Sequence, residues 1–203
     1  AGQYLPQTDF LLLVDADVMV SDFEQDVRCL LEHWGFGCEE SEHSPLILQA
    51  EDPPGNPWNW WEFNKTHRVL NVNTGFMALR NHARTQWLWQ RFQEECAHNY
   101  TQWQTVWYWD QGFWNGYVRP LMAPWEHIAL KCDQANGFRW LTSHDRGYGC
   151  AGQHVTHAWG FGKMDIAQEM FRRLLMRWSG QLEANLAHEH STYKQTFPFL
   201  TDS

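Results

Sequence analysis

Short apolar runs alternate with polar, turn-forming stretches along this chain, and the pattern predicts alternating strands and helices. The clearest run covers residues 10–14, where five apolar residues stand directly before Asp15 and Asp17. A run of that length is typical of a fully buried strand and is too short for a helix of its own. Residues 45–50 predict a second buried strand.

Four later stretches have the signals of helices. Ser21 and Glu24 form a capping box, which predicts a helix that runs to His33 or Trp34 and ends at the glycines of 35–37. Apolar residues at helical spacing predict further helices over 83–97, within 103–117 and, with an amphipathic pattern, over 165–178.

The remaining stretches predict a hairpin, a loop and a short strand. Residues 69–80 indicate two strands joined by a tight turn at Asn73-Thr74-Gly75, where glycine allows a positive φ or a close approach of the backbone to a ligand. Residues 51–61 hold three Pro, one Gly and three Trp, which favours a long loop. A short strand before residue 158 would position His157.

Composition narrows the class of protein. A chain of 203 residues with 43% hydrophobic content is long enough for one domain with a sizeable core. The net charge of −9, from 24 acidic and 15 basic residues, argues against nucleic acid or an anionic membrane surface as the main partner. The sequence contains no apolar run of about 20 residues, which is the length that a membrane-spanning helix needs. The fourteen Trp could stack on sugars or fill the core.

The five cysteines and the first residues leave two questions open. The cysteines are widely spaced without a Cys-x-x-Cys pair, which disfavours a zinc knuckle or a thioredoxin motif. One or two disulfides would suit a secretory lumen, and five thiols would suit the cytosol. The chain begins without Met and reaches a core strand within ten residues, so we expect a piece of a longer protein.

The acidic pair at the end of the first strand is the main candidate for chemistry. At spacing two on an extended chain the carboxylates of Asp15 and Asp17 face opposite ways, so a turn at Ala16 is needed before both serve one site. Carboxylate oxygens are preferred by hard divalent cations, and open α/β sheets bind ligands beyond the carboxyl ends of their strands. The alternative is that both residues cap the following helix.

A family resemblance becomes specific once the motifs are taken in order. They are the strand ending in Asp-x-Asp, the Asn-x-Gly turn, Asp110-Gln111 within a helix, and a late His-x-x-Gly-x-x-Lys, spread over residues 8–165. The order resembles the GT-A class of nucleotide-sugar glycosyltransferases, in particular the galactosyl-, mannosyl- and xylosyltransferases related to xyloglucan xylosyltransferases. The late motif is similar to that of glycogenin-like and lipopolysaccharide galactosyltransferases.

The resemblance implies an α/β fold of GT-A (Rossmann-like) type, with a mixed sheet flanked by helices. The whole chain, 1–203, would be a single catalytic domain. In that family two or three βα units precede the Asp-x-Asp strand and bind the nucleoside. Because about ten residues precede that strand here, these N-terminal nucleotide-binding units are expected to be missing.

The same resemblance assigns roles to individual residues. Mn²⁺, or another divalent cation, would be held by Asp15, Asp17 and His157, with His154 as an alternative ligand to His157. The donor would be bound by Asp15, Asn73, Gly75, Gly160 and Lys163, and Asp110 with Gln111 would lie at the transferred sugar. Independently, the aromatic faces of Trp58, Trp60 and Trp61 are suited to an acceptor sugar.

The resemblance implies transfer of a hexose or pentose from a nucleotide-diphosphate sugar to a glycan or glycoprotein acceptor, and it alone implies retention of configuration. The resemblance also implies the Golgi or another secretory lumen in a eukaryote, with membrane contact only through a segment absent from this chain. Two alternatives remain. A haloacid dehalogenase-type phosphatase would use Asp15 as its nucleophile, and a non-catalytic sugar-binding module would use the Trp residues without a metal.

Overall fold

The structure, a computed structural model, divides into two compact units, residues 1–160 and 161–203. It describes residues 2–20, 25–37, 43–54, 60–64, 67–105, 109–137, 150, 152–157, 167–168 and 171–181. The first unit contains the sheet and nearly all predicted site residues.

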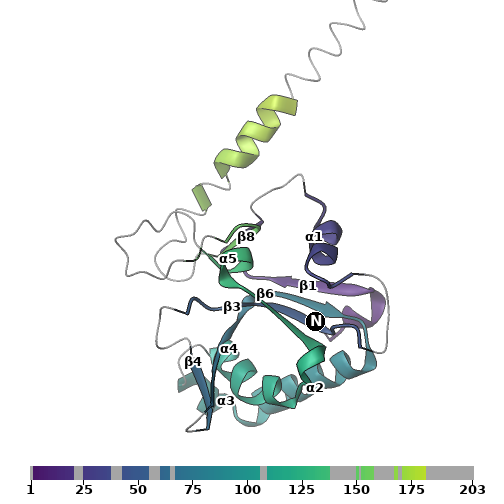
Figure 1. Ribbon diagram of the computed structural model, residues 1–203, viewed down its shortest axis with the longest axis vertical. Helices are drawn as coiled ribbons and strands as arrows, with labels where there is room; N and C mark the ends of the chain where they lie inside the picture. Colours follow the sequence, from purple (N-terminus) through teal and green to yellow (C-terminus); the bar gives the residue numbers. More distant parts are fainter. Residues whose placement is uncertain are drawn as a thin grey trace, which may run out of the picture. The chain divides into compact units, whose positions relative to one another are not determined.

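A four-stranded mixed sheet forms the centre of the first unit (Figure 1). Its order is β1 (Phe10–Val14), β6 (Val72–Arg80), β3 (Ile47–Glu51) and β7 (His127–Leu130). Strand β6 is antiparallel to β1 and to β3, and β7 is parallel to β3. Strands β1, β3 and β7 therefore run in one direction, and their carboxyl ends meet the start of β6 at one edge of the sheet.

Helices cover both faces of this sheet, because its strands alternate their apolar side chains between two cores. Leu48 of β3 and Phe76 of β6 pack with Leu30 and Leu31 of α1 (Val27–His33). On the other face Met77 and Leu79 pack with residues of α2 (Ala83–His98), α4 (Trp109–Phe113) and the π-helical segment η3 (Trp114–Val118). Figure 1 shows α1 and α2 on opposite sides of the strands. The predicted mixed α/β sheet flanked by helices is confirmed.

Two smaller sheets and several short helices complete the first unit. Strand β2 (Val18–Val20) pairs antiparallel with β8 (Val155–His157), and β4 (Trp60–Asn64) pairs antiparallel with β5 (His67–Leu70). The short α-helices are α3 (Tyr100–Thr105) and α5 (Cys132–Ala135). The 3₁₀ segments are η1 (Leu5–Gln7), η4 (Arg119–Leu121) and η5 (Pro124–Glu126).

The first helix starts later than the capping box predicts. Its N-cap is Asp26, whose side chain accepts a hydrogen bond from the Arg28 amide, whereas Ser21 and Glu24 lie outside the described residues. A helix running without a break from Ser21 is therefore wrong, because the chain at Asp26 is extended. The predicted end is confirmed, since Gly35 follows the helix with a φ of 75°.

The predicted hairpin at 69–80 is also wrong. Residues 72–80 form one continuous strand, and the chain bulges where a tight turn was predicted. Gln49 of β3 pairs with Met77 of β6, while the next residue, Ala50, pairs with Asn73. Residues 74–76 therefore bulge out of the β3–β6 ladder, which bends a strand locally without reversing it.

Two further predictions need correction. Trp60 and Trp61 belong to strand β4 and not to the long loop, because this segment pairs with β5. Strand β1 is half-buried instead of fully buried, and Val14 at its end is 46% exposed. The reason is its position at the edge of the described sheet, where one side of the strand has no described neighbour.

The second unit is described over 167–168 and 171–181, all of which are helical, as the predicted helix at 165–178 requires for those positions. Phe171, Leu175 and Trp178 are exposed on this helix. Among the described residues, no helix has the length and apolar content needed to cross a membrane.

Candidate metal centre and its hydrogen-bond network

The chemistry-bearing residues gather at the edge where β1, β3 and β7 end. Asp15 follows β1, Asp52 follows β3, and Asn136 follows β7 after the short helix α5. Asn73 lies at the start of the antiparallel strand β6, which begins at the same edge. The direction of the strands therefore places residues that are far apart in sequence beside one another, as expected for ligand sites in open α/β sheets.

Asp15, Asp17 and His157 form the centre of this site. One ligand atom from each residue lies within 4.8 Å of the other two. A turn follows β1, in which the Val18 amide donates to the Asp15 carbonyl over 3.1 Å and the Asp15 amide donates to the Gly75 carbonyl over 2.8 Å. The sequence predicts that Asp17 and His157 converge on one point, and this convergence is confirmed.

Backbone pairing on both sides fixes the position of His157. It is the last residue of β8 and pairs with Val18, directly after the acidic turn. On its other side the His157 amide donates to the Gly137 carbonyl over 3.0 Å. The side chain is buried, and its Nε2 lies 3.4 Å from Oδ1 of Asp17.

The side-chain amide of Asn136 determines which nitrogen of His157 carries a proton. Asn136 Nδ2 donates to the Glu51 carbonyl over 3.0 Å and to Asp52 Oδ1 over 3.1 Å, so Oδ1 is the atom that faces Nδ1 of His157 at 2.9 Å. A carbonyl oxygen can only accept, so Nδ1 donates. In neutral imidazole the lone pair then belongs to Nε2, which faces Asp17.

Asp52 is the buried anchor of this network. Its carboxylate accepts from Asn136 and from Asn73, at 3.1 Å each, and also from Nε2 of Gln111. Burial raises the pKa of Asp52 to about 6, against the opposing effect of the three hydrogen bonds and of nearby His157. Because each of the three side-chain amides donates to Asp52, each is held in one orientation. The network therefore orients Asn136 and, through it, His157.

The bulge in β6 lies against the metal-ligand candidates. Asn73 Nδ2 also donates to Gln111 Oε1 over 2.9 Å, and Asn73 Oδ1 accepts from the Gly75 amide over 2.8 Å. A Cβ atom on Gly75 would lie 2.9 Å from Nε2 of His157 and closer still to Cε1. Glycine is therefore required for the close approach of this backbone to His157. Gly75 is not among the glycines with positive φ.

The two residues predicted at the transferred sugar have different environments. Gln111 is buried, and its amide is used by Asp52 and Asn73. Asp110 is exposed, and its Oδ2 accepts from the Thr74 hydroxyl over 3.0 Å. Of the pair, Asp110 therefore has the side chain that solvent and a ligand can reach.

The other predicted site residues have separate outcomes. Trp58, Gly160 and Lys163 lie outside the described residues, and the side chains of Trp60 and Trp61 are not described either. His154, the alternative metal ligand, packs against the residue that follows α1, with its ring centroid 5.8 Å from that of Trp34. It is not part of the cluster of Asp15, Asp17 and His157.

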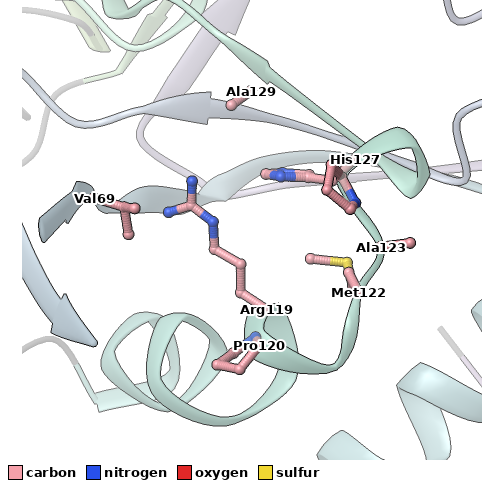
Figure 2. Close-up of a pocket in the computed structure, with 8 residues that line it drawn as sticks. Val69, Arg119, Pro120, Met122, Ala123, His127 and Ala129 are labelled. Atoms are coloured by element: carbon pink, nitrogen blue, oxygen red, sulfur yellow. The ribbon is translucent and has the colours of Figure 1, made fainter. Parts of the chain in front are cut away.

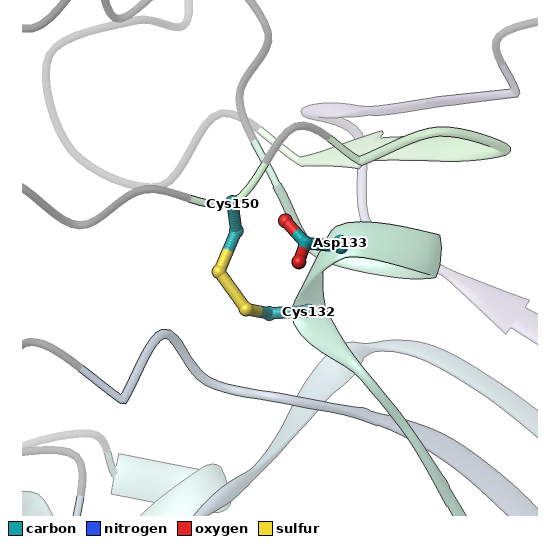
Figure 3. A group of neighbouring side chains, drawn as sticks. All are labelled: Cys132, Asp133 and Cys150. Atoms are coloured by element: carbon teal, nitrogen blue, oxygen red, sulfur yellow. A yellow bond between two sulfur atoms is a disulfide. The ribbon is translucent and has the colours of Figure 1, made fainter.

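A disulfide joins the two segments that carry the network. Cys132 of α5 is bonded to Cys150, which precedes β8 (Figure 3). Asp133 lies beside the bridge, but sulfur atoms bonded to each other offer no thiolate for a metal. The bridge connects the segment that ends at Asn136 to the segment that ends at His157.

Sequence reasoning missed Asp52 and Asn136. A signal for Asp52 was available, because it follows the second buried strand just as Asp15 follows the first. Asn136 offered no such signal, since it comes after a one-turn helix and its role depends on contacts with β3 and β8.

Comparison with known proteins is informative at the level of the fold. No protein-family model matches the chain, and no curated protein matches it. Among solved structures, the chain is similar to a glycosyltransferase involved in the glycosylation of the major capsid of PBCV-1. The TM-score is 0.53 at 14% identity, over 84% of this chain and 70% of that one. The chain has a glycosyltransferase-like fold.

At this identity the likeness concerns the fold alone. It agrees with the observed mixed sheet flanked by helices, and it leaves the subtype of enzyme, its donor and its metal to be argued from the site.

Proposed function

We propose that this chain is a metal-dependent glycosyltransferase domain that transfers a sugar from a nucleotide diphosphate. The observation that carries the proposal is the convergence of Asp15, Asp17 and His157 within 4.8 Å at the carboxyl edge of the sheet. The glycosyltransferase-like fold agrees with it.

The donor set fits a divalent cation. Nε2 of His157 and Oδ1 of Asp17 are two acceptors that face each other at 3.4 Å, which requires a proton or a cation between them. Two carboxylates and one imidazole are ligands that suit Mn²⁺. When bound, such an ion would neutralise charge on the diphosphate leaving group.

The neighbouring residues suggest how the donor would be oriented. The exposed carboxylate of Asp110 is available to accept hydrogen bonds from sugar hydroxyls, and its contact with Thr74 fixes its direction. The backbone at Gly75 comes close to the metal ligands because it has no side chain. We assign Gln111 to holding Asn73 and Asp52 in place. Lys163 and Gly160, which lie outside the described residues, are assigned to the diphosphate from the family resemblance alone.

The finer parts of the activity follow from the family resemblance. They are a hexose or pentose as the transferred sugar, retention of configuration, and a glycan or glycoprotein as the acceptor, which Trp58, Trp60 and Trp61 would contact. The Cys132–Cys150 bridge is suited to an oxidising compartment, which agrees with a secretory lumen.

Two alternative functions account for less of the geometry. The phosphatase hypothesis needs Asp15 as a nucleophile and has no use for an imidazole 3.4 Å from Asp17. The sugar-binding module needs neither the acidic turn nor the network that orients His157. Neither alternative uses the orientation of His157 that the network around Asp52 imposes.

The proposal is tested by Mn²⁺ binding and donor turnover. We expect the chain to bind Mn²⁺ by calorimetry, and we expect donor hydrolysis or transfer to stop in EDTA. His157→Ala removes a ligand, so its Mn²⁺ affinity should fall by more than the roughly 10–100-fold typical of losing a residue that only supports a ligand.

His98→Ala is the matched control, because His98 is exposed on α2 and contacts the Glu94 carbonyl. Wild-type Mn²⁺ affinity in His157→Ala, or turnover that EDTA does not reduce, would refute the proposal. Loss of turnover with Asp15→Asn but not with His157→Ala would favour the phosphatase.

A further inference from the structure

A cavity of about 630 Å³ lies between strand β7 and the segment that runs from η4 to η5 (Figure 2). Asp15 and Asp17 follow β1, which is the outer strand on the opposite side of the four-stranded sheet from β7. Most of the cavity lining is apolar and comes from Val69, Pro120, Met122, Ala123, Pro124 and Ala129. The two remaining lining residues, Arg119 and His127, are polar.

Arg119 brings a positive charge into this apolar lining. Its Nη1 donates to the Leu70 carbonyl over 2.5 Å and to Asn115 Oδ1 over 3.2 Å. Within the described part of the chain, no carboxylate forms an ion pair with it, and no hydrogen bond uses its Nε or Nη2. A guanidinium stays charged in proteins, so this one is a partly buried cation. The charge of Glu51 acts on it from the neighbouring hollow, without an ion pair between the two.

His127 adds a buried nitrogen, Nε2, that has no hydrogen-bond partner among the described residues. Burial and the charge of Arg119 lower the pKa of His127 to about 3, so the ring is neutral. Figure 2 shows the imidazole and the Arg119 guanidinium both directed into the space bordered by Val69 and Ala129. Buried polar atoms normally have a partner, so this one calls for a ligand.

The charge of the cavity indicates the class of ligand. With His127 neutral, Arg119 contributes a single positive charge. A neighbouring hollow of about 500 Å³ shares Val69 and Arg119 and includes Glu51, which lies 3.8 Å from Lys131. The carboxylate of Glu51 disfavours a second negative charge nearby. A doubly charged, strongly hydrated phosphate therefore fits poorly between apolar walls, whereas one carboxylate balances one guanidinium.

We propose that this cavity binds an organic monocarboxylate, whose carboxylate pairs with Arg119 and accepts a hydrogen bond from Nε2 of His127. Val69, Met122 and Pro124 would contact the apolar face of the ligand. A sugar acid and an aromatic acid share this chemistry. The proposal does not depend on the metal centre or on sugar transfer.

Calorimetric titration of the whole chain with glucuronate, benzoate, glucose and inorganic phosphate tests the proposal. We expect saturable binding of at least one carboxylate, and no binding of glucose or phosphate at the same concentrations. Arg119→Gln should weaken binding by about tenfold or more, because a hydrogen-bonded ion pair is lost. Whether glucuronate or benzoate binds identifies the source of the carboxylate.

His127→Phe is a second variant that tests the proposal if Arg119→Gln fails to fold. Phenylalanine has nearly the shape of histidine without Nε2, so we expect weaker carboxylate binding together with an unchanged or raised melting temperature. Arg28→Gln, at an exposed arginine on α1, is the control and should bind as wild type. Three results would overturn the proposal. They are no saturable binding of either carboxylate, wild-type affinity in His127→Phe, or phosphate binding as tight as that of the carboxylates.

Discussion

The amide of Asn136 links the buried and the reactive parts of the site. Its nitrogen donates to Asp52 and to the Glu51 carbonyl, and its oxygen faces Nδ1 of His157. A metal ligand of this type commonly has its second ring nitrogen fixed in the same way. Asn136 is therefore a positioning residue, because it acts through His157.

Asn136→Ala should weaken Mn²⁺ binding by about 10–100-fold, since His157 loses the acceptor that fixes its tautomer. Calorimetry measures the affinity, and nitrogen NMR of the imidazole should show that the Nδ1-protonated form is no longer dominant. The control is Asn99→Ala, at an exposed asparagine that follows α2. An unchanged imidazole spectrum with unchanged affinity would contradict the positioning role.

Asp52 should make stability depend on pH. Its pKa is raised from 3.8 to about 6 in the folded chain, chiefly by burial. Between these values the folded state holds more protons than the unfolded state, so stability falls as the pH rises. The stability that the raised pKa contributes is fully present below pH 3.8 and is lost above about pH 6. Over this window the free energy of unfolding should fall by about 3 kcal/mol, at 1.36 kcal/mol per pKa unit.

Urea unfolding in EDTA, from pH 4 to 7, measures this effect for the wild type and for Asp52→Asn. The difference in the free energy of unfolding should shift in favour of the variant as the pH rises through the window. Asp52→Asn also alters the hydrogen bonds, which changes the free energy of unfolding by the same amount at every pH. This constant difference does not affect how the free energy depends on pH. A difference that stays flat across the window would show that Asp52 titrates alike in both states.

At the scale of elements, the site depends on an irregularity in β6. The strand leaves its regular pairing with β3 between Asn73 and Met77, which brings Gly75 against His157. The start of the strand is held in turn by Asn115, whose side chain exchanges two hydrogen bonds with the backbone of Val72. A regular ladder at this point would direct these residues elsewhere.

The Cys132–Cys150 bridge should stabilise the same region. It spans 18 positions, and a loop of that size contributes about 3 kcal/mol by restricting the unfolded chain. Replacing both cysteines by serine should lower the free energy of unfolding by about that amount and weaken Mn²⁺ binding, because α5 and β8 lose their link. Urea unfolding and calorimetry measure the two effects.

Cys29→Ser is the matched control, because Cys29 is exposed and forms no disulfide. The bridge would have no stabilising role if the double variant unfolded at the same urea concentration as this control.

At the scale of the whole molecule, the direction of the strands determines where the site forms. Three strands end at one edge and the antiparallel β6 starts there, so each contributes its adjacent polar residue to the same place. The overall charge of −9 is compatible with a bound cation.

The sequence by itself determined the parts that depend on local pattern. The strand at 10–14, the long helix from Ala83 and the strand before residue 158 are present as predicted. The strand predicted at 45–50 is present at 47–51. The convergence of Asp17 and His157 could also be predicted, because Asp17 follows one apolar strand, His157 ends another, and sheets bring strand ends together.

Tertiary structure alone decided the rest. A glycine in an extended run fits a turn or a bulge equally well, and the pairing of β6 with both β1 and β3 selected the bulge at Gly75. Asn136 and Arg119 have ordinary local sequences, and their importance arises from partners distant in the chain. Hydrogen bonds between distant residues leave no periodic signal in a sequence, so the buried network around Asp52 and the cavity beside β7 became visible only after folding.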